Sequence, residues 1–201
     1  MSNHFIRLIT LTLICVSTVV AQRQSSSLKP SPPKSVRVTP IAAGWRIFTA
    51  PDNDFVVQFP AEPQRDTEIK TPSETMRRYS SVGGTILFQL MFFDTEFDPT
   101  SRDGNQLPVN FRQDMLDQAQ QEGWTITRSQ LLRKNVYEQE RWAPMDKNPN
   151  QKLHVVTRHI RRYGRQYILA CSSLIPDKTL DSIICHRFID SFHSIEAPQP
   201  K

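Results

Sequence analysis

The chain has 201 residues, enough for one domain of ordinary size with short extensions. Its 38% hydrophobic and 22% charged residues exclude a wholly disordered chain, a collagen-like fibre and a protein with many membrane spans. The net charge of +5 comes from the first 44 residues, which hold five basic residues and no acidic one. The remainder is formally neutral, so the charge gives no reason to expect nucleic-acid binding.

Residues 1–21 have the pattern of a secretory signal peptide. Arg7 stands before an apolar segment, Leu8–Val20, and Ala21 offers a small residue after which cleavage can occur. As a helix this segment spans about 20 Å, short of a hydrocarbon core of roughly 30 Å, so we expect cleavage, with retention as an anchor as the alternative. A lipoprotein attached at Cys15 is disfavoured, because a bulky residue precedes that cysteine. We therefore expect a secreted or periplasmic protein.

Residues 22–43 predict a disordered linker. Serine, proline and basic residues dominate, so the stretch cannot bury enough apolar surface to offset the entropy lost on ordering. Its positive charges would also suit attachment to an anionic envelope surface, which is a separate functional alternative. Residues 196–201 are expected to form a short tail.

Cys171 and Cys185 are the two cysteines that the mature chain would keep. An even pair in an oxidising compartment predicts a disulfide bond, which would stabilise the fold by ~3 kcal/mol. A redox-active pair would need C-x-x-C spacing or a thiolate at a helix N-terminus, so that alternative is disfavoured.

Residues 44–195 predict a single α+β domain that is rich in strands. The expected strands are residues 45–49, 54–59, 65–70, 75–82, 85–93, 124–132, 135–143, 152–162 and 165–174. The run at 85–93 is almost entirely apolar, which predicts the centre of the sheet, and Tyr163-Gly164 predicts a hairpin turn. Trp124 and Trp142 are expected in the core.

Two amphipathic helices are expected far apart in the chain. The first, from about Pro108 to Gly123, has an apolar stripe of Phe111, Met115, Leu116 and Ala119. The second, over about 177–192, has a stripe of Leu180, Ile183, Ile184, Phe188 and Phe192, with Cys185 at its edge. Because strands and helices do not alternate, we expect a mostly antiparallel sheet of about seven to eight strands with both helices packed on it, an α/β/α sandwich-like arrangement.

Two framework segments resemble a known family. Phe55-Val-Val-Gln-Phe-Pro-Ala-Glu-Pro63 near the start of the domain and Arg187-Phe-Ile-Asp-Ser-Phe192 near its end are similar to secreted bacterial domains of the PsbP-like α/β/α sandwich type. The resemblance covers most of residues 45–195 and rests on hydrophobic residues. It implies the fold and an accessory, non-catalytic role at extracytoplasmic complexes, and it assigns no functional residue to this chain.

An acidic cluster follows the expected central strand. It consists of Asp94, Glu96, Asp98 and Asp103. Alternating carboxylates supply oxygen ligands to Ca²⁺, so Asp94, Glu96 and Asp98 are a candidate metal site, and the loop 94–103 would serve a metal-assisted hydrolase. A solvated loop is the simpler interpretation, because Pro99 stands where an EF-hand loop requires glycine. The chain also lacks the common short motifs of catalysis.

A basic cluster lies along the last expected hairpin. It consists of Arg158, Arg161, Arg162 and Arg165 with Tyr163. Guanidinium groups beside aromatic rings suit an anion or an acidic partner, and a solvated hairpin end is the alternative. Alternation along the strand places Arg158 and Arg162 on one face, and His159 and Arg161 on the other.

The histidines are not expected to bind zinc. His154 and His159 should lie on opposite faces of a strand, whereas His186 and His193 should share one side of the second helix. Two such residues do not form a zinc site without further ligands.

These patterns together predict an exported, non-catalytic binding or accessory module without a cofactor. Its expected partner is an envelope protein or a second copy of the chain, with no nucleic acid and only transient membrane contact through the signal peptide or linker. The loop 94–103 and the hairpin 158–165 are the predicted working surface.

Overall fold

The structure is a computed structural model, which describes residues 37–40, 44–65, 69–70, 75–95, 106–145, 148–162, 164–174 and 178–195. The chain divides into two units, 1–34 and 35–201, and every described residue lies in the second. The predicted signal peptide, residues 22–36 and 41–43 of the predicted linker and the tail 196–201 lie outside the described residues.

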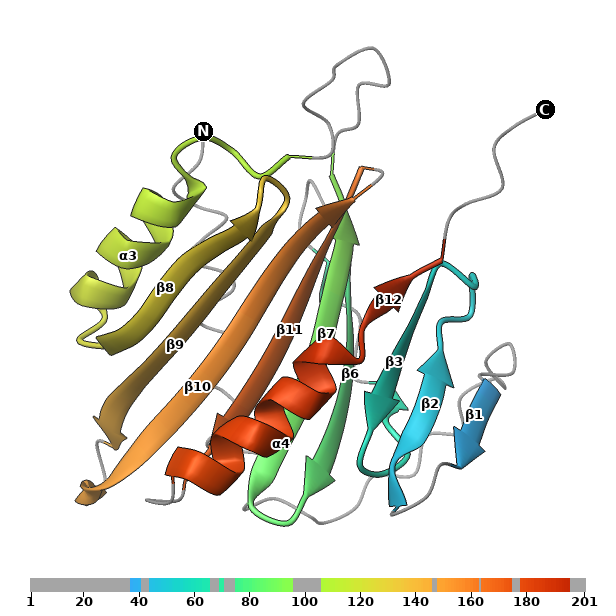
Figure 1. Ribbon diagram of the computed structural model, residues 1–201, viewed down its shortest axis with the longest axis horizontal. Coiled ribbons are helices and arrows are strands. Elements are labelled where there is room, and N and C mark those ends of the chain that lie inside the picture. Colours follow the sequence, from blue (N-terminus) through green and yellow to red (C-terminus); the bar gives the residue numbers. More distant parts are fainter. Residues whose placement is uncertain are drawn as a thin grey trace. The chain divides into compact units, whose positions relative to one another are not determined.

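Two antiparallel sheets and two helices make up the described part of the second unit (Figure 1). The larger sheet has the strand order β4-β6-β7-β11-β10-β9-β8, and β5 also pairs with β6. Its strands are β4 (Gln64–Arg65), β5 (Ile69–Lys70), β6 (Thr75–Gly83), β7 (Ile86–Asp94), β8 (Thr125–Arg133), β9 (Val136–Met145), β10 (Asn148–Arg162) and β11 (Arg165–Ser173). The α+β class and the eight-stranded antiparallel sheet agree with the sequence prediction.

The smaller sheet was not expected as a separate sheet. It has the order β1-β2-β3-β12, formed by β1 (Arg37–Pro40), β2 (Arg46–Thr49), β3 (Phe55–Phe59) and β12 (His193–Ser194). β1 lies inside the stretch predicted as a disordered linker and pairs with β2, which lies outside it. The prediction of disorder is therefore wrong for residues 37–40. β12 consists of two residues, too few to give a pattern in the sequence.

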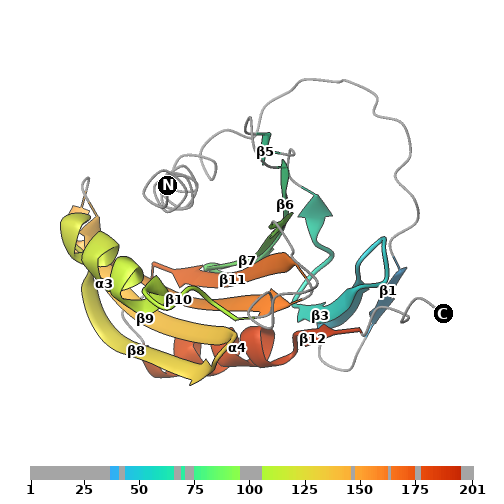
Figure 2. The same ribbon diagram turned by 90° about the horizontal axis from the view of Figure 1, so that it is seen from above.

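The two helices cover opposite faces of the larger sheet (Figure 2). They are α3 (Phe111–Gln121) and α4 (Lys178–Asp190). Since side chains alternate along a strand, Phe88 and Cys171 point to the face under α4, here called the α4 face, whereas Tyr137 and His159 point to the α3 face.

The main core lies on the α4 face. Aromatic rings from both sheets meet there: Phe188 of α4 lies 5.1 Å from Phe59 and 5.4 Å from Phe88, measured between ring centroids. β7 is buried along nearly its whole length, as expected for the centre of the sheet. Burial of these rings contributes about 2 kcal/mol for each fully buried side chain.

The buried side of α4 differs from the predicted stripe. Cys185, Phe188 and Ile189 are fully buried, whereas Ile183, expected on the apolar stripe, is 63% exposed. The helix also ends at Asp190, so Phe192 lies beyond it and packs against Tyr167 of β11. Ile183 and Phe188 are five residues apart, so at 3.6 residues per turn their side chains point about 140° apart, and only Phe188 faces the core.

The first helix agrees better with its prediction. Met115 and Ala119 of α3 are buried, and Phe111 packs edge-to-face on Tyr137 of β9. Trp124 and Trp142, in contrast, are only half-buried, so the expectation that both belong to the core is wrong. Each lies under a cationic side chain, which accounts for its position at the boundary of the core.

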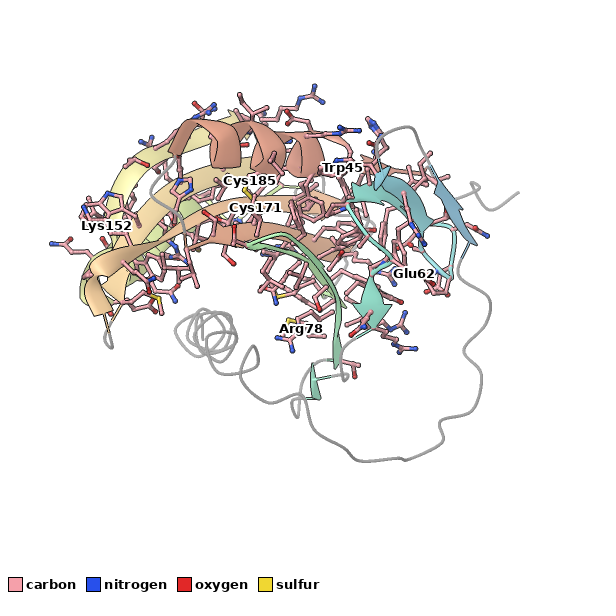
Figure 3. The ribbon with its side chains drawn as sticks, turned by 90° about the horizontal axis from the view of Figure 1, so that it is seen from below. Trp45, Glu62, Arg78, Lys152, Cys171 and Cys185 are labelled. Carbon is pink, nitrogen blue, oxygen red and sulfur yellow. A yellow bond between two sulfur atoms is a disulfide. The ribbon has the colours of Figure 1, made fainter. Side chains whose placement is uncertain are left out.

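A disulfide joins Cys171 of β11 to Cys185 of α4, as predicted (Figure 3). The two Cα atoms lie 5.5 Å apart. Among the described residues, no helix is both long enough and apolar enough to cross a membrane.

Candidate functional site

Asp94 of the predicted acidic cluster meets Arg165 of the predicted basic cluster at one end of the larger sheet. Arg165 begins β11 and Asp94 ends the neighbouring strand β7, where the register places the two residues opposite each other. The Nε of Arg165 donates to Asp94 Oδ1 at 2.6 Å, and its Nη1 donates to Asp54. The guanidinium is only 20% exposed, so it serves as a fixed link among three segments.

The two acids change the proton affinities of their neighbours. Burial would lower the pKa of Arg165, but the hydrogen bonds and charges of Asp94 and Asp54 outweigh burial and raise that pKa. The pKa of Tyr167 is also raised, first by burial and then by the charge of Asp54, to which its hydroxyl donates at 3.2 Å. Both groups therefore stay protonated at neutral pH.

Arg158 forms a second internal link. Its guanidinium donates twice to Glu138 Oε2 on β9, at 2.9 Å from Nε and 2.5 Å from Nη2, and also contacts Asp190 at 2.7 Å. Glu138 is 1% exposed, so Arg158 compensates a buried charge and fastens the end of α4 to the sheet.

The other predicted arginines separate as the strand alternation requires. Arg162 lies on the α4 face with Arg158 and donates to Ser194 of β12. Arg161 lies on the α3 face and faces Gln166 in the register. Tyr163 lies outside the described residues. Its contact with a partner, like that of the four arginines, stays a prediction.

The predicted metal site is only partly described. Asp94 is engaged by Arg165, while Glu96, Asp98 and Asp103 lie outside the described residues. Within the described ranges, no three histidine, cysteine or acidic residues are grouped as they would be around a metal ion. The metal site therefore stays a prediction, with one of its three carboxylates already paired.

The histidines occupy unlike positions. His154 Nε2 lies 2.7 Å from Glu140 Oε1 on the α4 face, and His159 is buried on the α3 face, as alternation predicts. His186 belongs to α4, but His193 pairs with Val56 in β12, so the prediction that both share a helix side is wrong.

A cluster of buried polar residues on the α3 face was missed from the sequence. Gln139 and Arg141 of β9 and His159 of β10 are each at most 3% exposed. Tyr137, beside them, accepts a hydrogen bond from Gln139 Nε2 at 3.1 Å, and its hydroxyl lies 3.0 Å from Ser129 Oγ. Burial lowers the pKa of His159 to about 3, with a further contribution from the charge of Arg141. The alternation of Tyr137, Gln139 and Arg141 could have placed them on one face, but not beneath α3.

The comparisons with known proteins concern the fold. Neither a protein family nor a curated protein sequence matches the chain. The solution structure of cyanobacterial PsbP (CyanoP) from Synechocystis sp. PCC 6803 is similar, with a TM-score of 0.50 and 11% identity over 76% of this chain and 94% of that chain.

Two further solved structures are less similar. A mutant of the protein Mog1 has a TM-score of 0.45 and 10% identity, over 76% of this chain and 96% of its own. A protein of unknown function, PA94 from Pseudomonas aeruginosa, has a TM-score of 0.42 and 8% identity, over 83% of this chain and 99% of its own. The similarity to CyanoP, together with the two sheets and two helices described above, shows that this chain has a PsbP-like fold.

Proposed function

We propose that this chain is an exported, non-catalytic accessory module that binds a protein partner in the periplasm or cell envelope. The observation that carries the proposal is the disulfide between Cys171 and Cys185. Structural disulfides persist in oxidising compartments and are rare in the cytosol. The apolar pattern of residues 1–21 supports export independently.

The internal pairing of charged side chains supports a role in binding. Arg165 is held by Asp54 and Asp94, and Arg158 by Glu138 and Asp190. These groups neutralise one another and join neighbouring elements, so they stabilise the fold. A general acid, base or nucleophile instead needs a lone pair or proton that faces the substrate.

The end of the sheet around Asp94 and Arg165 is the surface we propose for docking. Asp94 is 73% exposed although it is ion-paired, Arg165 faces it from β11, and Arg162 faces Arg165 from β10. Charges already held in fixed positions lose little side-chain entropy when a partner binds. This arrangement of positive and negative charges would select a partner with the complementary pattern.

Crosslinking in cells tests this proposal. The full chain is produced in its own organism, crosslinked and recovered from the envelope fraction, together with the variants Asp94→Lys and Asp117→Lys. Asp117 is an exposed acid on α3, so its variant makes the same charge change away from the proposed surface.

We expect Asp94→Lys to reduce the yield of the crosslinked partner about tenfold, because like charges would meet at the interface, and Asp117→Lys to leave it unchanged. Equal losses in both variants, or equal retention, would exclude the proposed surface. Recovery of the chain from the cytosol with both thiols free would overturn export itself.

A further inference from the structure

Buried polar atoms without a partner gather on the α3 face. Within the part of the chain that the structure describes, Gln139 Oε1, Arg141 Nε and Nη1, and both ring nitrogens of His159 are buried without a hydrogen-bond partner. Gln139 and Arg141 lie two residues apart on β9, and Gln139 faces Thr157, two residues before His159 on β10. Folded proteins leave few such atoms unpaired, so five on neighbouring residues require a cause.

Arg141 is the charged residue of this group. The residue is 3% exposed, and its guanidinium carbon lies 4.6 Å from the centroid of the Trp124 ring. Stacking on the indole orients the guanidinium group, and the face of the ring offers no conventional lone pair to its N–H groups. The side chain therefore presents oriented, unpaired donors.

No acid within the described ranges completes these bonds. Glu122, at the end of α3, is the acid whose charge acts on Arg141. It is exposed, and its carboxylate accepts a hydrogen bond from Gln118 Nε2 at 2.8 Å. A buried guanidinium is costly unless a negative charge compensates it, and Glu122 does not accept from Nε or Nη1.

We propose that Arg141 binds a small oxyanion, such as a carboxylate or a phosphate, beneath the C-terminal end of α3. An oxyanion supplies a hydrogen-bond acceptor and a compensating negative charge together, whereas water supplies only the acceptor. His159 is uncharged, because its pKa is about 3, so Arg141 is the cation of this group that an anion would compensate. A cation would be repelled by Arg141, so the same residues do not suit a metal ion.

Trp124 provides a direct readout, because an anion on Arg141 neutralises the charge stacked on its ring. The folded full chain is titrated with sodium phosphate and with sodium acetate, against sodium chloride at equal ionic strength, while tryptophan emission is recorded. We expect a saturable change with at least one oxyanion beyond that seen with chloride, and none in Trp124→Phe. The two oxyanions distinguish a phosphate site from a carboxylate site.

The matched control is Arg187→Gln. Arg187 is exposed and lies over the ring of Trp45 at 4.4 Å, so it repeats the cation–ring contact outside the buried cluster. We expect Arg187→Gln to keep the oxyanion response and Arg141→Gln to abolish it. Should Arg141→Gln fail to fold, Arg141→Lys decides, with affinity expected to fall about tenfold because lysine lacks the guanidinium geometry.

Three results would overturn this assignment. The first is emission that responds to oxyanions no more than to chloride, which would mean that water alone satisfies the buried atoms. The second is an unchanged response in Trp124→Phe. The third is an equal affinity of Arg141→Lys and the unmodified chain. None of them bears on the proposed protein partner, whose surface lies at the Asp94 end of the sheet.

Discussion

Arg165 and Asp94 face each other across β11 and β7, and the Arg165 Nε donates to the Asp94 carboxylate at 2.6 Å. The sequence presents these residues as members of two separate clusters of opposite charge. In the folded chain the two side chains neutralise each other, and Asp54 also pairs with Arg165. The surface at this end of the sheet is therefore an array of paired charges.

Removing the charge of Asp54 should lower the pKa of Tyr167. The charge of Asp54 adds to the effect of burial, and both favour the neutral phenol. In Asp54→Asn the pKa should fall yet stay above its ordinary value, because burial is the larger cause. The raised pKa gives stability that is present below about pH 10 and is lost as the pH rises above it, so Asp54→Asn should show less of this alkaline loss.

The titration is followed by the absorbance of tyrosinate, with Tyr167→Phe to identify the contribution of this residue among the four tyrosines. An unchanged or higher pKa of Tyr167 in Asp54→Asn would show that the carboxylate does not act on it.

Breaking the link between Arg158 and Glu138 should be costly. Arg158→Met leaves a carboxylate that is 1% exposed with Arg128, at 3.4 Å, as its remaining cation. We expect the free energy of unfolding to fall by about 3 kcal/mol, near the lower end for a broken buried ion pair. Urea denaturation measures it.

The double variant Arg158→Met, Glu138→Met should recover most of this loss, since no buried charge then lacks its partner. Additive losses in the double variant would show that the two side chains act independently.

The disulfide should stabilise the fold by restricting the conformations of the unfolded chain. Cys171→Ala with Cys185→Ala removes a bond that closes a loop with a sequence separation of 14. We expect the free energy of unfolding to fall by about 3 kcal/mol, although some of this loss comes from the buried sulfur atoms that are removed. Reduction of the unmodified chain, which keeps both sulfur atoms, serves as the control and should give a loss of similar size. No change on reduction would contradict the expected role of the bond.

His159 should make the chain sensitive to acid. Its pKa of about 3 lies below the value of about 6.5 in an unfolded chain, so the unfolded state binds the proton more tightly between these values. Stability from the neutral imidazole is present above about pH 6.5 and falls by about 1.4 kcal/mol per pH unit as the pH decreases toward 3.

The measurement compares the unfolding free energy of the unmodified chain, His159→Leu and His193→Gln across this pH range. The difference between His159→Leu and the unmodified chain should change with pH, whereas the exposed His193 should contribute little. If the difference in unfolding free energy between His159→Leu and the unmodified chain stays constant with pH, folding does not change the pKa of His159, which would contradict the prediction.

Much of the framework could be predicted from local pattern. The apolar run of β7, the helix α3 and the hairpin of β10 and β11 follow from periodicity and turn residues, because each lies in continuous sequence. Phe192 was placed in the helix because an apolar stripe does not show where a helix ends, and Ile183 was placed on the buried side although it lies about 140° around the helix from Phe188. β1 was missed because its four residues gain their order only by pairing with β2.

The candidate sites depended on contacts that the sequence does not encode locally. Asp54 and Arg165 are 111 residues apart, and Arg158 and Asp190 belong to a strand and a distant helix. Arg141 gave no signal, because single polar residues in strands are ordinarily solvated, and His159 was considered only for its strand face and as a zinc ligand. Their burial follows from the position of α3 over this face of the sheet.

We propose above all that the chain works outside the cytoplasm as a folded, disulfide-bonded module. Intact-mass analysis of the protein purified from its own organism, after alkylation without reductant, measures the N-terminus and the thiols together. We expect a chain that begins at Gln22, with Cys171 and Cys185 unmodified by the alkylating reagent. A chain that begins at Met1 and carries the alkyl group on both residues would contradict it.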